Sequence, residues 1–142
     1  MRGLAAIAVV LALSAVPVYG GDFEDGLNAY QRKDYASALT SWNKAAAQGS
    51  AQAQFTLGFM YEKGEGVAPD SKQALSWYEQ AAGQGFAAAP TTLGSMYEKG
   101  QGTAQNIGQA VSWYQKAADQ KQAEAQFNMG RMYQTGQGVA QD

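Results

Sequence analysis

Few residues of this chain could take part in chemistry. Ser41 and Lys44 stand three positions apart, the spacing at which some penicillin-recognising enzymes activate a serine with a lysine. The sequence contains no cysteine and no histidine, which excludes thiol nucleophiles, imidazole bases, disulfides and zinc sites with the usual ligands. Most familiar enzyme chemistries therefore lose their usual groups, and we expect no catalytic residue, no metal site and no cofactor.

Two further patterns have both a chemical and a structural interpretation. Gly64 and Gly66 resemble part of a phosphate-binding loop, but a helix rather than a strand is expected before them, and neither a third glycine nor a Lys-Ser/Thr pair follows. We interpret the pair as a turn. Asp70 precedes a predicted helix, where a carboxylate caps free backbone N–H groups, and capping explains this residue better than acid–base catalysis.

Composition indicates one folded unit without a polyanionic partner. The 142 residues are 46% hydrophobic and 15% charged, as in ordinary folded domains. Ten basic and twelve acidic residues give a net charge of −2 and form no basic block. The electrostatic footprint expected for binding to nucleic acid or to an anionic membrane surface is missing.

The first 20 residues have the organisation of an export signal. Arg2 precedes an apolar run from Leu4 to Val16, and the residues at 17–20 are small or tolerated where a signal peptidase cleaves. This run forms a helix of about 20 Å, shorter than a hydrocarbon core of roughly 30 Å, so a retained membrane anchor is the weaker interpretation. We expect removal of residues 1–20, a periplasmic or secreted product of residues 21–142, and no stable membrane insertion afterwards.

A repeat of 36 residues organises the rest of the sequence. Residues 51–86 and 87–122 are identical at 20 of 36 positions without a gap, and residues 123–142 match the first 20 positions of the unit at 12. Before them, residues 22–49 form a related hairpin whose loop is predicted to be five residues shorter. Such self-similarity indicates stacked structural units. The exported chain is thus divided into one hairpin, two repeats and one partial repeat.

Each unit is predicted to be a pair of helices. Apolar residues at helical spacing form one stripe on the first helix, at Ala53, Leu57, Met60 and Tyr61, and another on the second, at Ala74, Trp77, Tyr78, Ala81 and Ala82. Both stripes are expected to face the core. Trp77 and Trp113 are predicted to be large buried rings, and the core of the front hairpin is predicted to contain Phe23, Leu27, Tyr30, Leu39, Trp42 and Ala46.

Small and polar residues mark the helix ends. Gly64 is placed to end the first helix in the left-handed conformation, and Asp70 and Asn106 are placed to cap the second helices. Pro90 fits only the first turn of a helix, so that helix is expected to begin near Ala89. The glycines at 58, 94 and 130 fall in mid-helix at a cost of about 1 kcal/mol relative to alanine, which indicates a neighbouring helix that a side chain would block.

These residues resemble the Sel1-like repeat, a relative of the tetratricopeptide repeat. The pattern here is Ala53-x-x-x-Leu57-Gly58-x-x-Tyr61-x-x-Gly64-x-Gly66-Val67, then Asp70, then Ala74-x-x-Trp77-Tyr78-x-x-Ala81-Ala82. The resemblance covers nearly all of residues 21–142, with the short-looped hairpin closer to a tetratricopeptide unit. It implies an all-α fold, an α-solenoid of stacked antiparallel helix pairs in a right-handed superhelix. It also implies a non-catalytic scaffold or adaptor for other proteins, and several secreted bacterial members act in the cell envelope or on hosts.

The same resemblance places the first helix of each unit on a concave groove. We expect a partner protein or peptide to contact side chains that lie off the apolar stripe, namely Phe55, Phe59, Glu62, Lys63, Thr91, Ser95, Glu98, Lys99, Phe127 and Arg131. Exposed aromatic rings among alternating charges suit an extended or helical peptide. Two alternatives stay open: Phe55 and Phe127 plug between adjacent helices, and the Glu-Lys pairs at 62–63 and 98–99 are solvated helix ends.

The partial repeat has no second helix. We expect its single helix to leave an apolar side uncovered around Ala125, Met129, Met132 and Tyr133. This end would then stack on another copy or on a partner, unless the chain is a truncated form of a longer repeat protein.

A different function remains as an alternative. A cysteine-rich relative of this repeat class has been linked to β-lactam binding, so a β-lactam-binding hydrolase that uses Ser41 is conceivable. However, Ser41 and Lys44 occupy positions where the next unit has Trp77 and Gln80, which is typical of variable packing or surface positions, and the paired cysteines of that relative are absent.

Overall fold

A computed structural model describes residues 20–135, and these residues form seven α-helices and no strand. The helices are α2 (Gly20–Gln31), α3 (Tyr35–Ala47), α4 (Ala51–Lys63), α5 (Ser71–Gly83), α6 (Ala89–Lys99), α7 (Ile107–Asp119) and α8 (Ala123–Thr135). The predicted export signal lies outside the described residues except for Gly20, the first residue of α2.

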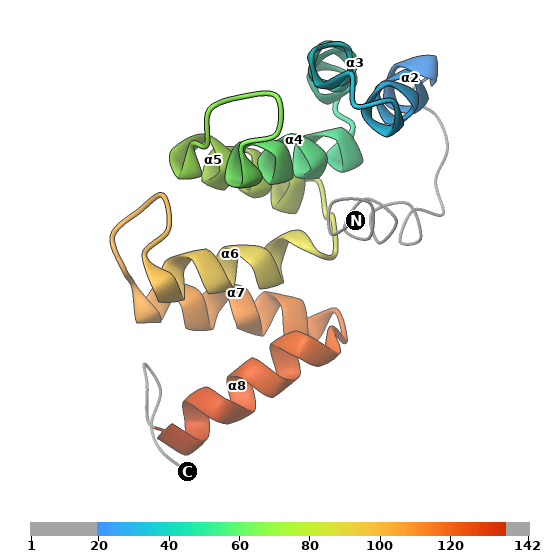
Figure 1. The fold of residues 1–142 in the computed structure, drawn as a ribbon. Helices are drawn as coiled ribbons and strands as arrows, with labels where there is room; N and C mark the ends of the chain where they lie inside the picture. The colour runs from blue at the N-terminus through green and yellow to red at the C-terminus, as the bar shows by residue number, and fades with distance from the viewer. Residues whose placement is uncertain (1–19, 136–142) are drawn as a thin grey trace.

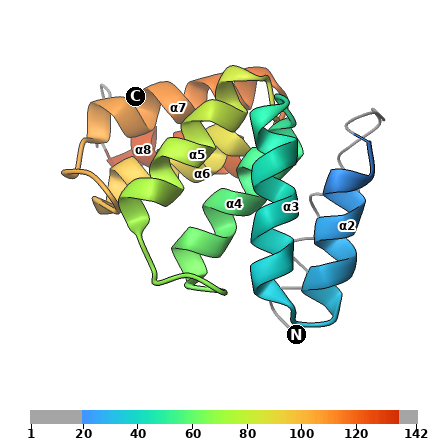
Figure 2. The same cartoon turned by 90° about the horizontal axis from the view of Figure 1, so that it is seen from above.

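Each helix packs against the next one along the chain. Helices α2 and α3, α4 and α5, and α6 and α7 form three hairpins, and α8 packs against α7. Figure 1 shows these layers stacked from α2–α3 at one end to α8 at the other, and Figure 2 shows the same stack from above. The predicted all-α solenoid is confirmed. None of the helices within residues 20–135 is long and apolar enough to cross a membrane.

The helix ends follow the sequence signals. The side chain of Asp70 accepts hydrogen bonds from the backbone N–H groups of Lys72 and Gln73, and Asp34 and Asn106 cap α3 and α7 in the same way. Helices α4 and α6 end in left-handed glycines, at φ 72° for Gly64 and 69° for Gly100. Helix α6 begins at Ala89 with Pro90 in its first turn, as predicted.

The mid-helix glycines receive aromatic rings. A Cβ atom added at Gly58 would lie 2.7 Å from Cε1 of Tyr78, and one added at Gly94 would lie 2.6 Å from Cδ1 of Tyr114. The predicted close approach of a neighbouring helix is therefore confirmed for these two glycines. No side chain fits between the two helices at either position, because real Cβ atoms essentially never come this near to another heavy atom.

The front hairpin contains the same contact in a shifted register. A Cβ atom at Gly26 would lie 2.4 Å from Nε1 of Trp42, so Gly26 is the counterpart of Gly58. Gly26 precedes Gly58 by 32 positions, whereas Trp42 precedes Tyr78 by 36. The first loop is therefore four residues shorter than the later loops. The predicted difference of five residues is wrong because it treated Tyr30 as the counterpart of Tyr61. By the glycine contacts, the counterpart of Tyr30 is Glu62.

The buried rings of the second helices are not the predicted ones. Trp77 and Trp113 are only half-buried, while Tyr78 and Tyr114 are each 1% exposed. Adjacent side chains point about 100° apart around a helix. Because the tyrosine faces the glycine of its own hairpin, the neighbouring tryptophan points toward the edge of that hairpin. Trp113 packs there against the Tyr78–Leu93 cluster. In the front hairpin, Leu39 of the predicted core is also only half-buried, and the other members are buried.

The open side of α8 also differs from the prediction. Ala125, Met129 and Met132 are buried in a cluster with residues of α7, so the apolar stripe is covered. Of the predicted residues only Tyr133 is uncovered, at 41% exposed, and it is joined by Phe127, at 71% exposed. The prediction for the first three residues is wrong because the preceding helix covers the stripe. Among residues 20–135, no heavy atom lies within 4 Å of a Cβ atom added at the mid-helix glycine, Gly130.

The Gly-x-Gly loops join neighbouring hairpins. Gly66 has φ 74°, and a Cβ atom there would lie 2.5 Å from Cβ of Tyr35 in α3. Gly102 has φ 76°, and its Cβ atom would lie 2.2 Å from the backbone oxygen of Ser71 in α5. Each loop thus packs tightly against the first residue of the preceding second helix. These contacts support the interpretation of the glycine pair as a turn.

Candidate interaction surface

Helix α4 presents an aromatic ring among charges. Phe59 is half-buried and lies outside the core clusters of the described residues. The Lys63 Nζ atom lies 5.9 Å from the centroid of this ring, within the range of a cation–π contact. Lys63 Nζ also lies 3.2 Å from Oε1 of Glu62. The predicted residues Phe59, Glu62 and Lys63 therefore form one patch at the end of α4.

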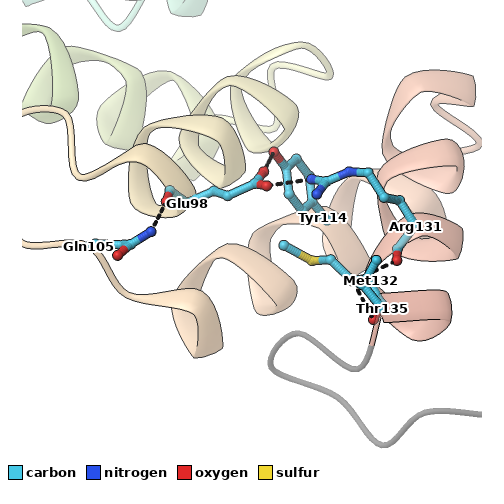
Figure 3. A network of polar contacts seen from close by, with 6 residues as sticks. All are labelled: Glu98, Gln105, Tyr114, Arg131, Met132 and Thr135. Carbon is cyan, nitrogen blue, oxygen red and sulfur yellow. Dashed lines mark hydrogen bonds and ion pairs between the residues drawn. The ribbon is translucent and has the colours of Figure 1, made fainter.

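A second polar group connects α6, α7 and α8, as Figure 3 shows. The Tyr114 hydroxyl donates a hydrogen bond of 2.8 Å to Oε2 of Glu98. Arg131 of α8 forms an ion pair with the other oxygen of the same carboxylate. The backbone oxygen of Glu98 accepts a 2.8 Å hydrogen bond from the Gln105 side chain. The predicted residues Glu98 and Arg131 thus meet, and their contact ties α8 to α6.

The tyrosine–glutamate contact repeats in the preceding unit. The Tyr78 hydroxyl donates to Oε2 of Glu62 at 2.8 Å. Burial, the Glu62 charge and this hydrogen bond raise the pKa of Tyr78 well above its usual range. Burial and the hydrogen bond to Glu98 also raise the pKa of Tyr114. Both phenols stay protonated near neutral pH and act as hydrogen-bond donors.

Glu98 remains ionised because it has two donors. Burial by itself raises the pKa of this carboxyl, but the hydrogen bonds from Arg131 and Tyr114 and the attraction of Arg131 outweigh burial. The pKa of Glu98 therefore lies below its usual value. The prediction that the Glu-Lys pairs are only solvated helix ends is wrong for Glu62 and Glu98, because both are half-buried and hydrogen-bonded. The prediction is confirmed for Lys63 and Lys99, which are exposed.

The remaining predicted residues have different environments. The Phe55 ring lies 4.9 Å from those of Tyr78 and Phe86, so it plugs between helices as the alternative proposed. Thr91 occupies the equivalent place in the next repeat, and its buried hydroxyl has no partner among the described residues. Ser95 is half-buried beside the Tyr114 hydroxyl. Phe127 does not plug between described helices, because it is 71% exposed.

The tyrosine hydroxyls were missed at the sequence level. Tyr78 is predicted only as a core residue, although its hydroxyl ties α5 to Glu62 of α4. A signal was present, because a glutamate precedes the tyrosine by 16 positions in both repeats, at Glu62 and Glu98. Identical spacing across two helices, repeated after 36 residues, indicates that the same two side chains meet in both repeats.

The serine and lysine of the hydrolase alternative are not arranged for catalysis. Ser41 is half-buried on α3 and Lys44 is exposed on the same helix, and no hydrogen bond joins them within residues 20–135. The same part of the chain contains no group of three or more acidic side chains that could hold a metal ion. The geometry therefore gives the hydrolase alternative no support.

The stacked hairpins, the glycine–ring contacts and the Gly-x-Gly loops are all features of one repeat. A family model for the Sel1 repeat matches residues 21–50, 51–86, 93–121 and 123–142. The chain belongs to the Sel1 repeat family. Sel1 repeats form protein-interaction scaffolds that are generally non-catalytic. A comparison with curated proteins gave no match.

Solved Sel1 structures have the same fold. A Sel1 repeat protein from Oxalobacter formigenes is 40% identical, with a TM-score of 0.78 over 84% of this chain and 49% of that one. A protective antigen of uropathogenic Escherichia coli strains is 34% identical, with a TM-score of 0.79 over 84% of this chain and 27% of that one. This chain therefore spans about half and about a quarter of their lengths. Helicobacter pylori cysteine rich protein B, at 23% identity and a TM-score of 0.68 over 89% and 93% of the two chains, shares the fold.

Proposed function

We propose that this Sel1 repeat chain is an exported, non-catalytic scaffold that binds a partner protein or peptide on the side of helices α4, α6 and α8. The observation that carries the proposal is Phe59, a half-buried aromatic ring that belongs to none of the core clusters of the described residues. Aromatic side chains supply much of the binding energy at protein interfaces, because they bury a large area at little conformational cost. Phe59 is accordingly the anchor of the proposed surface.

Charges around this ring would select the partner. Lys63 is exposed and Glu62 keeps part of its carboxylate accessible, while Lys99 repeats the basic position one unit later. A partner with an apolar anchor residue flanked by acidic and polar side chains would match this order of charges. The Glu98–Arg131 ion pair supports the proposal differently, because it links the side chains of α8 and α6 and so helps to preorganise the surface.

We place this scaffold in the periplasm or outside the cell. The support comes from the sequence at residues 1–20, where one basic residue precedes an apolar run of limited length. Expression of the full chain should give an extracytoplasmic product whose intact mass lacks residues 1–20. A product that retains these residues in the cytoplasm would contradict the export proposal and leave the proposed binding surface unaffected.

Affinity capture tests the binding surface. The chain is used as bait in an extract of the source organism's envelope, and the captured proteins are quantified for wild type, Phe59→Ala and Gln80→Ala. Gln80 is an exposed residue of a second helix and serves as the control. We expect one set of proteins to be lost with Phe59→Ala and kept with Gln80→Ala. Capture that both variants keep equally would contradict the assignment of Phe59.

A further inference from the structure

Glu62 and Glu98 are equivalent residues of two successive repeats, and each has the same kind of buried donor. Tyr78 donates a 2.8 Å hydrogen bond to Oε2 of Glu62. Tyr114 donates a hydrogen bond of the same length to Oε2 of Glu98, and both rings are 1% exposed. A fixed phenol therefore holds each carboxylate in place and leaves its Oε1 atom for another donor.

In the second of these repeats an arginine of the chain itself binds this oxygen. Arg131 of α8 forms an ion pair with Oε1 of Glu98, as Figure 3 shows. Glu98 is followed directly by Lys99, yet its ion pair is formed with the arginine 33 positions later. A planar guanidinium fits a carboxylate better than an ammonium group does, because its donors lie in a fixed fork. This carboxylate position therefore favours arginine over the neighbouring lysine.

The equivalent place beside Glu62 has no arginine. Ser95 follows Glu62 by 33 positions, as Arg131 follows Glu98. A serine carries no charge and is several atoms shorter than an arginine, so it forms no ion pair. The side chain of Glu62 is 29% exposed, against 20% for that of Glu98. The Glu62 carboxylate is thus the more accessible of the two.

The present contact of the Glu62 Oε1 atom is a weak one. Lys63, the next residue of the same helix, places its Nζ atom 3.2 Å away. Its side chain is 52% exposed, and ion pairs at exposed positions contribute little to stability. The same Nζ atom lies 5.9 Å from the centroid of the Phe59 ring, one turn before Glu62. A cation that contacts Glu62 can therefore also reach the face of this ring.

We propose that Glu62 and Phe59 bind an arginine side chain of the partner protein, in the place that Arg131 takes against Glu98 one repeat later. The guanidinium donates to Oε1 of Glu62 and stacks on the Phe59 ring. It releases Lys63, which can then meet an acidic side chain of the partner. The inference rests on the proposed scaffold function and specifies an arginine next to the partner's apolar anchor.

A titration with Nα-acetylarginine amide, followed through the backbone amide NMR signals of the chain, tests the site directly. We expect saturable shifts of the signals of Phe59, Glu62 and Lys63. The uncharged isostere Nα-acetylcitrulline amide should bind at least about tenfold more weakly, because it cannot form a charge-assisted hydrogen bond. Nα-acetyllysine amide should also bind more weakly, since an ammonium group lacks the planar fork. Equal affinities for the arginine and citrulline amides would overturn the inference.

Replacement of the carboxylate gives the matched pair of variants. Glu62→Gln keeps an acceptor for the Tyr78 hydroxyl but loses the charge, and it should lower the affinity for the arginine amide at least about tenfold. Glu79→Gln is the control, because Glu79 also accepts a tyrosine hydroxyl, that of Tyr97, but lies exposed on α5. It should keep the wild-type affinity. Equal affinities of both variants would contradict the assignment of Glu62.

Ser95→Arg supplies the arginine from the chain itself. It repeats the arrangement of Arg131 and Glu98 one unit earlier and should abolish binding of the arginine amide, whereas Ser95→Ala should retain it. Binding at Glu62 that Ser95→Arg leaves unchanged would overturn the equivalence of the two places. If Ser95→Arg does not fold, Glu62→Gln and its control decide alone.

Capture experiments separate this inference from the proposed function. Partners that are lost with Phe59→Ala should also be lost with Glu62→Gln and kept with Glu79→Gln. Partners that depend on Phe59 but not on Glu62 would overturn the arginine assignment and leave the scaffold function intact. The absence of any partner that depends on Phe59 would instead contradict the scaffold function, whatever the titration shows.

Discussion

The substitution Gly94→Ala tests the packing on which the solenoid depends. The new Cβ atom would lie 2.6 Å from Cδ1 and Cε1 of Tyr114, a ring that is 1% exposed and held by its hydrogen bond to Glu98. Overpacking of a core costs about 1–3 kcal/mol, and the fixed ring places this case near 3 kcal/mol. Alanine recovers about 1 kcal/mol through helix propensity. The net loss of folding free energy should be about 2 kcal/mol.

Circular dichroism at increasing temperature and in urea measures this loss. For a chain of this size, about 2 kcal/mol corresponds to a fall of about 8 °C in the melting temperature. Gly83→Ala, which adds the same methyl group in open space, should raise the melting temperature slightly. An unchanged or raised melting temperature of Gly94→Ala would refute the ring–glycine contact and with it the register of the helix pairs.

Three further predictions concern the core, a helix cap and pH. Trp42→Ala removes a completely buried ring and should lower the free energy of unfolding, measured in urea, by about 3–5 kcal/mol. Trp77→Ala, at a half-buried position, should lower it clearly less, and equal losses would contradict the difference in burial. Asp70→Ala removes the acceptor of two backbone N–H groups and should lower the free energy of unfolding by about 1 kcal/mol, with Asp70→Asn close to wild type. The raised pKa of Tyr78 means that its contribution to stability is complete below pH 10 and is lost as pH rises further, because only the unfolded chain releases the proton readily. Urea midpoints between about pH 9 and 11 should therefore fall less steeply for Tyr78→Phe than for wild type.

Most of the fold could be predicted from the sequence because the period of 36 residues fixes which positions are equivalent. A mid-helix glycine, as at 58 and 94, lowers helix stability relative to alanine, and its recurrence is explained by a neighbouring helix that leaves no room for a side chain. The caps at Asp70 and Asn106 depend on residues within one turn and were likewise predictable. The caps depend on residues close in sequence, and the glycines can be compared between equivalent positions of the repeats.

The errors arose where the answer depends on how the helices cross. Adjacent residues such as Trp77 and Tyr78 both belong to the apolar stripe, and the periodicity does not indicate which of them faces the glycine. The stripe of α8 was assigned to the open side because the pattern does not say which neighbour covers it. The pairing of Glu98 with Arg131 joins two helices of different units, so their spacing in sequence gave no indication of it.

The central claim is that the side of the solenoid formed by the first helices binds a protein. It is tested most directly by site-specific photo-crosslinking in the intact source organism, with a photoreactive amino acid in place of Phe59 or, as the control, Gln80. Phe59 is half-buried on a first helix and Gln80 is exposed on a second helix, so poor access would not explain a missing adduct at position 80. The account predicts a discrete covalent adduct from position 59 and none from position 80. Adducts of equal yield from both positions, or an adduct from position 80 alone, would contradict it.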